Sequence, residues 1–128
     1  MTLSMLVLLF LLTSCSNSQN SDKMIKQNQA TTIELTSFNL VNGVDETKFV
    51  EVAQKMQEDF LNQQEGFIKR TLVKGENNWT DVVYWKNREC IQNALKRAES
   101  SELVVPFMQM IDFNSVKMNL SEIKLTAN

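Results

Sequence analysis

The spacing of the hydrophobic residues changes repeatedly along residues 33–125, and this change constrains the fold more than any other feature of the sequence. Short apolar runs with β-branched and aromatic residues, or with two-residue alternation, are typical of strands. They occupy 33–40, 67–74, 79–85 and 115–125. Two intervening stretches have the three- and four-residue spacing of amphipathic helices. The predicted order is therefore strand, helix, strand, strand, helix, strand.

Polar and small residues mark the ends of the predicted helices. Asp45 stands where an N-cap or a first-turn acid of the first helix belongs, and this helix should end near Gly66, which can adopt a left-handed C-cap conformation. The second helix has Asn87 as its N-cap. Pro106 is tolerated in the first turn of a separate short helical segment over 104–111. The apolar faces of these three segments consist of Phe49, Val52, Ala53, Met56 and Phe60, then Ile91, Ala94, Leu95 and Ala98, then Phe107, Met110 and Ile111.

The strand predicted over 79–85 carries large side chains on both of its faces. One face has Val82 and Tyr84, and the other has Trp79, Asp81, Val83 and Trp85. A sheet with one face in water would not have this pattern, so helices should cover one side and a partner the other. We therefore predict an α+β domain over 32–128 with the ferredoxin-like βαββαβ order, an antiparallel four-stranded sheet and helices on one face. We expect it to form a homodimer through the open sheet faces.

The first residues of the chain are typical of an export signal. Residues 1–14 carry no charge, and the apolar run over 5–12 is too short to span a bilayer. The sequence Leu12-Thr13-Ser14-Cys15 resembles the bacterial lipobox, in which the Cys is lipidated before the signal is cleaved. We predict a lipoprotein signal peptide over 1–14, followed by lipidated Cys15 and a flexible Ser-, Asn- and Gln-rich tether over 15–31. The expected location is the bacterial cell envelope, on the periplasmic side of the outer membrane in a Gram-negative cell.

The composition excludes several classes of function. Histidine is absent, which removes His-based acid–base catalysis, Ser-His or Cys-His pairs, His zinc sites and proximal-His haem ligation. The net charge is −2, so the broad basic surface that would favour a nucleic-acid partner is not expected. No residue spacing typical of a metal site occurs.

The remaining reactive side chains have simple structural interpretations. Cys90 falls on the second predicted helix without a histidine to activate it, so we expect a small buried residue. If Cys15 is lipidated, Cys90 has no disulfide partner. The acidic residues are interpreted as solvated charges on helix surfaces. Trp79, beside the predicted hairpin turn, is expected at an interface or on the surface.

Several motifs between Glu34 and Glu122 are shared with a known family. They are Leu35-Thr36-Ser37-Phe38, Val41-Asn42-Gly43-Val44-Asp45-Glu46, Gln63-Gln64-Glu65-Gly66-Phe67, Leu72-Val73-Lys74-Gly75-Glu76, Val83-Tyr84-Trp85 and Pro106-Phe107. With these motifs, the stretch resembles the antibiotic biosynthesis monooxygenase-like domains of the dimeric α/β barrel superfamily. The resemblance implies two ferredoxin-like units whose sheets join into a barrel. It also implies a cavity between sheet and helices for a flat aromatic or haem-like ligand.

The resemblance suggests site residues as well. Some members oxygenate polycyclic phenols without metal or flavin and orient the substrate with a Trp and an Asn. Trp85 occupies a position like that of the family Trp, and Asn39 on the first strand could orient a phenol oxygen. Thr36 stands where haem-degrading members have an Asn, and those members also use a His, which is absent here. The other residues that could line a pocket are Phe38, Met56, Phe60, Phe107 and Met110, whose spacing equally fits a plain core.

Two hypotheses about function follow. In the first, the protein is an envelope lipoprotein that binds or oxygenates a small aromatic compound without a bound cofactor. In the second, it is a non-catalytic dimeric module for ligand binding or structure. A cavity onto which Trp85 and an amide converge would favour the enzyme, whereas a cavity filled by Met and Phe side chains would favour the module.

Overall fold

The computed structural model describes residues 30–127 of the chain. These residues form strands β1 (Thr32–Leu40), β2 (Phe67–Lys74), β3 (Trp79–Trp85) and β4 (Ile111–Glu122), and helices α2 (Glu46–Asp59), α3 (Arg88–Ala98) and α4 (Val105–Met108). Two 3-10 turns, η1 (Leu61–Gln63) and η2 (Glu102–Val104), lie after α2 and before α4. The predicted signal peptide, lipidated Cys15 and nearly all of the predicted tether lie outside the described residues.

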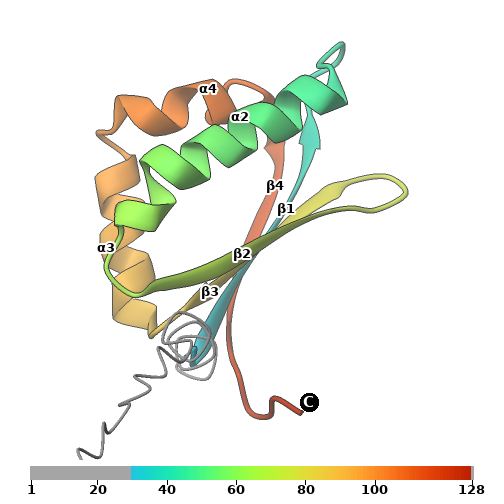
Figure 1. Cartoon of the computed structure of the whole chain (residues 1–128). Coiled ribbons are helices and arrows are strands. Elements are labelled where there is room, and N and C mark those ends of the chain that lie inside the picture. Colours follow the sequence, from blue (N-terminus) through green and yellow to red (C-terminus); the bar gives the residue numbers. More distant parts are fainter. Residues whose placement is uncertain (1–29, 128) are drawn as a thin grey trace, which may run out of the picture.

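The strands form one antiparallel sheet in the order β2-β3-β1-β4, and the helices cover one of its faces (Figure 1). The predicted ferredoxin-like α+β fold is therefore confirmed. Val82 and Tyr84 lie half-buried on the face away from the helices. Pairing of that open face with a second copy stays a prediction.

Both predicted N-caps are present. The Asp45 carboxylate accepts a hydrogen bond from Lys48 N at 2.8 Å, and the Asn87 side chain accepts one from Cys90 N at 2.9 Å. Each bond satisfies an amide that the first turn of a helix leaves without an intrahelical partner. Cys90 itself is buried on α3, as predicted.

Several element boundaries differ from the prediction. The last strand ends at Glu122 rather than at Leu125, and Ile111 begins this strand instead of ending the short helical segment. Helix α2 ends at Asp59 rather than near Gly66, because the chain tightens into η1 and buries the successive side chains of Phe60 and Leu61. Strand β4 begins at Ile111, four residues before the predicted start at Ser115. Its first residues pair with the end of β1 across a register shift between Ser37 and Asn39, which the polar residues near its start concealed.

An aromatic cluster fills the core between the sheet and α2. The Phe49 ring lies 5.9 Å from Phe38, 5.4 Å from Phe107 and 5.0 Å from Trp79, measured between ring centroids. Trp79 therefore packs against the core on the helix side of the sheet, and its predicted place at an interface or on the surface is wrong. The indole and the Phe49 ring meet in an edge-to-face arrangement, with an interplanar angle of 73°.

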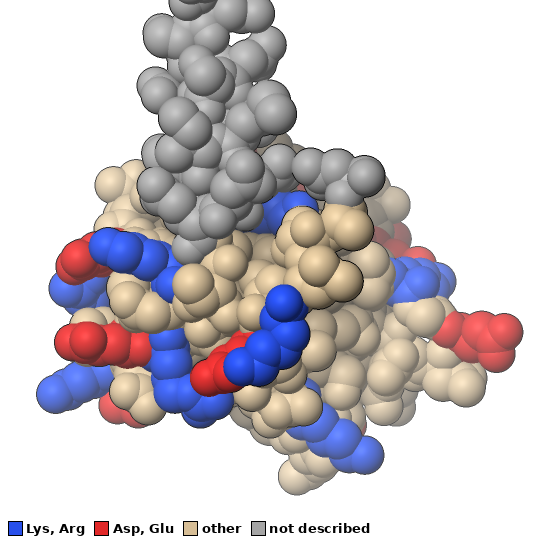
Figure 2. Space-filling model, turned by 90° about the horizontal axis from the view of Figure 1, so that it is seen from below, with Lys and Arg blue, Asp and Glu red and all other residues tan. Residues whose placement is uncertain are grey.

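The charges on the outside of the domain are mixed. In the view of Figure 2, basic and acidic side chains lie interspersed over the face shown. Within residues 30–127, no helix has both the length and the apolar content needed to cross a membrane.

Candidate functional site

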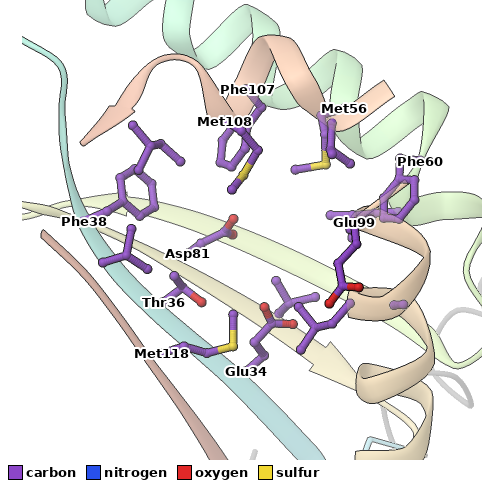
Figure 3. Close-up of a pocket in the computed structure, with 18 of the residues that line it drawn as sticks. Glu34, Thr36, Phe38, Met56, Phe60, Asp81, Glu99, Phe107, Met108 and Met118 are labelled. Carbon is purple, nitrogen blue, oxygen red and sulfur yellow. The ribbon is translucent and has the colours of Figure 1, made fainter. Parts of the chain in front are cut away.

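A cavity of about 470 Å³ lies between the helix-facing side of the sheet and the helices above it (Figure 3). This volume is within the range of small-molecule sites, which is roughly 300–1,000 Å³. Its walls are mostly apolar side chains from β1, β3, β4, α2, α3 and α4. Glu99 and Met118, which is 46% exposed, lie where the cavity opens between the end of α3 and β4. The cavity is thus shaped for a largely apolar small molecule.

Most of the residues proposed from the sequence line this cavity. They are Trp85, Thr36, Phe38, Met56, Phe60 and Phe107. Met110 packs against the core without lining the cavity. Asn39 is exposed and lines a separate hollow beside the β2–β3 turn, because its side chain does not share the β1 face of Glu34, Thr36 and Phe38. Among the lining residues, all from the described part of the chain, none carries an amide side chain.

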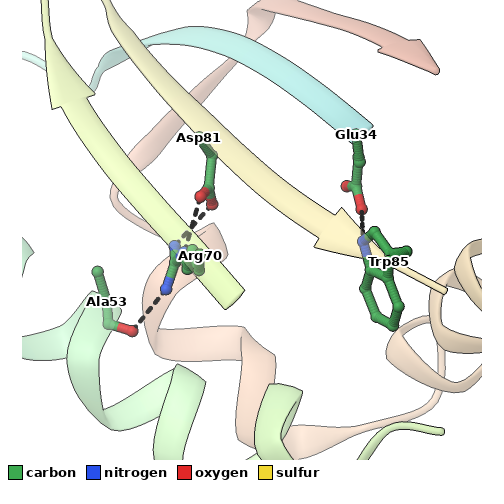
Figure 4. Close-up of polar contacts among 5 residues, drawn as sticks. All are labelled: Glu34, Ala53, Arg70, Asp81 and Trp85. Atoms are coloured by element: carbon green, nitrogen blue, oxygen red, sulfur yellow. Dashed lines mark hydrogen bonds and ion pairs between the residues drawn. The ribbon is translucent and has the colours of Figure 1, made fainter. Parts of the chain in front are cut away.

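A buried carboxyl group stands where an amide was expected. The Trp85 indole Nε1 donates a hydrogen bond to Glu34 Oε2 at 3.1 Å, across the β1–β3 pair (Figure 4). Burial raises the pKa of Glu34 above its ordinary value, and the negative charge of Asp81 raises it further. The hydrogen bond from Trp85 and the positive charge of Arg70 act in the opposite direction. Glu34 is therefore a carboxyl group that accepts protons more readily than a solvated one.

The second carboxylate of the cavity is fully paired. Arg70 on β2 donates from Nε and Nη2 to the two oxygens of Asp81 on β3, each at 2.7 Å (Figure 4). Its Nη1 donates to the carbonyl oxygen of Ala53 on α2 at 2.8 Å, so one guanidinium joins the sheet to that helix. The side chains of Arg70 and Asp81 are only 3% and 10% exposed. The charge of Asp81 is thus balanced by Arg70, and the pair links the strands and the helix that form this wall of the cavity.

Thr36 supplies an unpaired hydroxyl group. Its Oγ1 is buried and has no hydrogen-bond partner of regular geometry among residues 30–127, although it lies close enough to Glu34 to lower the pKa of that carboxyl weakly. Figure 3 shows the side chains of Glu34, Thr36 and Asp81 directed toward the cavity from neighbouring strands. A buried hydroxyl without a partner costs free energy, so a ligand that bonds to it recovers that cost.

The sequence interpretation proposed Thr36 but missed the roles of Glu34, Asp81 and Arg70. It treated the acidic residues as solvated surface charges, which is wrong for Glu34 and Asp81. The available signal was strand parity, because Glu34 shares a face with Phe38 and Asp81 shares a face with Trp85. The partner of Asp81 was not readable, since Arg70 lies beside it only through the β2–β3 register.

The raised pKa of Glu34 makes folding stability depend on pH. Between the ordinary value of 4.5 and the higher folded value, the folded protein binds a proton more tightly than the unfolded chain. Stability contributed by Glu34 therefore falls as pH rises through this window, and Glu34→Gln removes the dependence. We expect the melting temperature of Glu34→Gln, relative to wild type, to be higher at pH 7 than at pH 4 in circular dichroism. Equal differences at both pH values would contradict this account.

Solved structures share this fold. SnoaB, a cofactor-independent oxygenase from Streptomyces nogalater, is 15% identical, with 76% of this chain and 96% of that chain covered and a TM-score of 0.62. The ActVA-Orf6 monooxygenase of Streptomyces coelicolor, solved with nanaomycin D, is 12% identical over 79% and 94% of the two chains, with a TM-score of 0.63. A candidate antibiotic biosynthesis monooxygenase from Bordetella bronchiseptica is 16% identical over 75% and 99%, with a TM-score of 0.61.

At these identities the similarity shows the fold alone, which this domain shares with solved structures of monooxygenases and of candidate antibiotic biosynthesis monooxygenases. No protein-family model and no curated protein sequence matches the chain. The activity therefore has to be argued from the side chains of the cavity.

Proposed function

We propose that this domain binds a small aromatic compound in the cavity between sheet and helices and oxygenates it without a bound cofactor. The observation that carries the proposal is an apolar cavity of about 470 Å³ with one proton-accepting carboxyl group, Glu34, fixed at its wall by Trp85. SnoaB, which shares the fold, is a cofactor-independent oxygenase, and ActVA-Orf6 was solved with nanaomycin D in place.

In this proposal Glu34 acts as the base. Its carboxylate would accept a proton from an acidic ring methylene of the ligand, leaving an electron-rich anion that reacts with dioxygen. The methylene becomes a carbonyl group, with one oxygen atom of O₂ in the product and the other in water. Dioxygen is the oxidant, so the balance requires no further reductant.

A specific observation favours non-catalytic binding as the second candidate. The Trp85 N–H is already bonded to Glu34, and none of the described residues that line the cavity carries an amide to orient a substrate oxygen. A site of this kind could hold an aromatic ligand without turning it over.

Oxygen uptake in the presence of anthrone separates the two candidates. Binding to the purified protein is followed through Trp fluorescence, because Trp85 lines the cavity. We expect saturable binding together with oxygen consumption that Glu34→Gln reduces by about 10²-fold or more, as for loss of a catalytic base. Binding without oxygen consumption would leave a ligand-binding module, and the absence of binding would overturn both candidates.

We also propose that the domain is tethered to a membrane of the bacterial envelope through lipidated Cys15. The lipobox-like sequence supports this assignment, and lipid chains contribute about 0.8 kcal/mol of membrane binding per buried methylene. Cys15→Ala is expected to move most of the protein from the membrane fraction to the soluble fraction. Fractionation that does not change in this variant would contradict the anchor, and Cys90→Ala provides the matched control.

A further inference from the structure

The polar groups of the cavity are hydrogen-bond acceptors rather than cations. Three of the lining residues are acidic, namely Glu34, Asp81 and Glu99, while Lys and Arg are absent from the lining as far as the described chain shows. Asp81 is occupied on both oxygens by Arg70. Glu34 accepts the indole N–H of Trp85 on Oε2, and the Thr36 side chain lies beside the same carboxyl group and lowers its pKa. The Glu34 carboxyl group and the Thr36 hydroxyl group are thus the polar groups left for a ligand.

We propose that Glu34 and Thr36 receive the hydrogen-bond-donating head group of an otherwise apolar ligand, a hydroxyl or an ammonium group, and that the site rejects ligands with a carboxylate there. The inference rests on the proposed ligand-binding function and names the substrate class for that cavity. Trp85 has a positioning role, because its N–H fixes one oxygen of Glu34.

Rejection of anions follows from the way in which Arg70 is used. Three of its five N–H groups are engaged, two with Asp81 and one with the Ala53 carbonyl oxygen. Its side chain is only 3% exposed and does not line the cavity, so it is not placed to bind an anionic ligand there. A ligand carboxylate would lie beside the Glu34 carboxyl group among apolar side chains, without water to screen it. Two carboxyl groups close together in an apolar cavity disfavour the charged form of each other. The ligand carboxylate also loses its hydration there, and no cation among the described lining residues compensates for that loss.

Four probes with the same ring system test the inference by isothermal titration calorimetry. They are naphthalene, 2-naphthol, 2-naphthylmethylammonium and 2-naphthoate. We expect 2-naphthol or the ammonium probe to bind about tenfold more tightly than naphthalene, since each donates to Glu34 and Thr36, and 2-naphthoate to bind more weakly than naphthalene. The tighter of the two donor probes identifies the head group.

Glu34→Gln should reduce the preference for the ammonium probe over 2-naphthoate by about tenfold, because it removes the negative charge and keeps the shape. Glu65→Gln, at an exposed carboxylate outside the cavity lining, is the matched control and should change each affinity by less than about twofold. Thr36→Val, which removes only the hydroxyl group, is the second variant and should weaken 2-naphthol binding while leaving naphthalene binding unchanged.

The outcomes separate this inference from the proposed function. Equal binding of all four probes, tight binding of 2-naphthoate, or an order of affinities that both Glu34→Gln and Thr36→Val leave unchanged would overturn the inference alone. If none of the probes binds, the proposed ligand-binding function is overturned together with it.

Discussion

Replacement of Arg70 with methionine is expected to lower the free energy of unfolding by about 3–5 kcal/mol, the cost of breaking a buried ion pair by removing one partner. Arg70 is 3% exposed, and its removal leaves the Asp81 carboxylate buried among apolar groups without its two 2.7 Å hydrogen bonds. The bond from Nη1 to the Ala53 carbonyl oxygen and the contact with the Phe107 ring at 5.1 Å are lost as well. Urea denaturation followed by circular dichroism measures the change.

The double variant Arg70→Met/Asp81→Leu is the control for this prediction. It removes both charges and fills the space with apolar side chains, so it should recover most of the lost stability. An equal loss in the single and double variants would show that the packing of the Arg70 stem, rather than an uncompensated charge, is what the domain requires.

Replacement of Gly66 with alanine is expected to lower the free energy of unfolding by about 2–5 kcal/mol. Gly66 has a φ of 78°, a left-handed conformation that costs a residue with a Cβ roughly 1–2 kcal/mol. A Cβ there would also lie 2.7 Å from Cys90 Cβ, so the first turn of α3 must shift, and overpacking of this kind costs about 1–3 kcal/mol. Thermal and urea denaturation of the variant and the wild type measure the total loss of unfolding free energy.

Gly43→Ala separates the two contributions. Gly43 has a similar φ of 84°, but a Cβ at this position meets no heavy atom within 4 Å. Its replacement should therefore cost only the backbone part, about 1–2 kcal/mol. Equal losses at the two glycines would contradict the close approach of the β2 entry loop to α3.

Local sequence patterns predicted the order of helices and strands in this fold, because the interactions that fix these elements join residues that are close in sequence. Asp45 and Asn87 accept hydrogen bonds from helix amides three residues ahead of them. The alternation along 79–85 placed Trp85 on one face and Tyr84 on the other. The boundaries of β4 could not be read in the same way. Its first residues are held by pairing with β1 across a register shift, and that pairing leaves no mark in the local pattern.

The candidate site was predicted in its apolar part and at Thr36, but not at its charged residues, for the same reason. Phe38, Met56 and Phe107 have the spacing of core residues, and residues on the inner faces of helix and strand line the cavity whether or not it is filled. The pairs Glu34–Trp85 and Arg70–Asp81 are 51 and 11 residues apart in sequence, and each depends on strand register. Asn39 was proposed as an amide on the first strand that could orient a phenol oxygen, but its side chain lies at a separate hollow.

The central claim is that the cavity between sheet and helices is where an aromatic ligand binds, and a mouth-blocking variant tests it most directly. Met118 and Val50 are each 46% exposed, but only Met118 lines the cavity. The measurement is the affinity of 2-naphthol for Met118→Trp and Val50→Trp by calorimetry. We predict a loss of affinity of at least about tenfold for Met118→Trp and an unchanged affinity for Val50→Trp. Binding to Met118→Trp as tight as to wild type would contradict the assignment of this cavity as the ligand site.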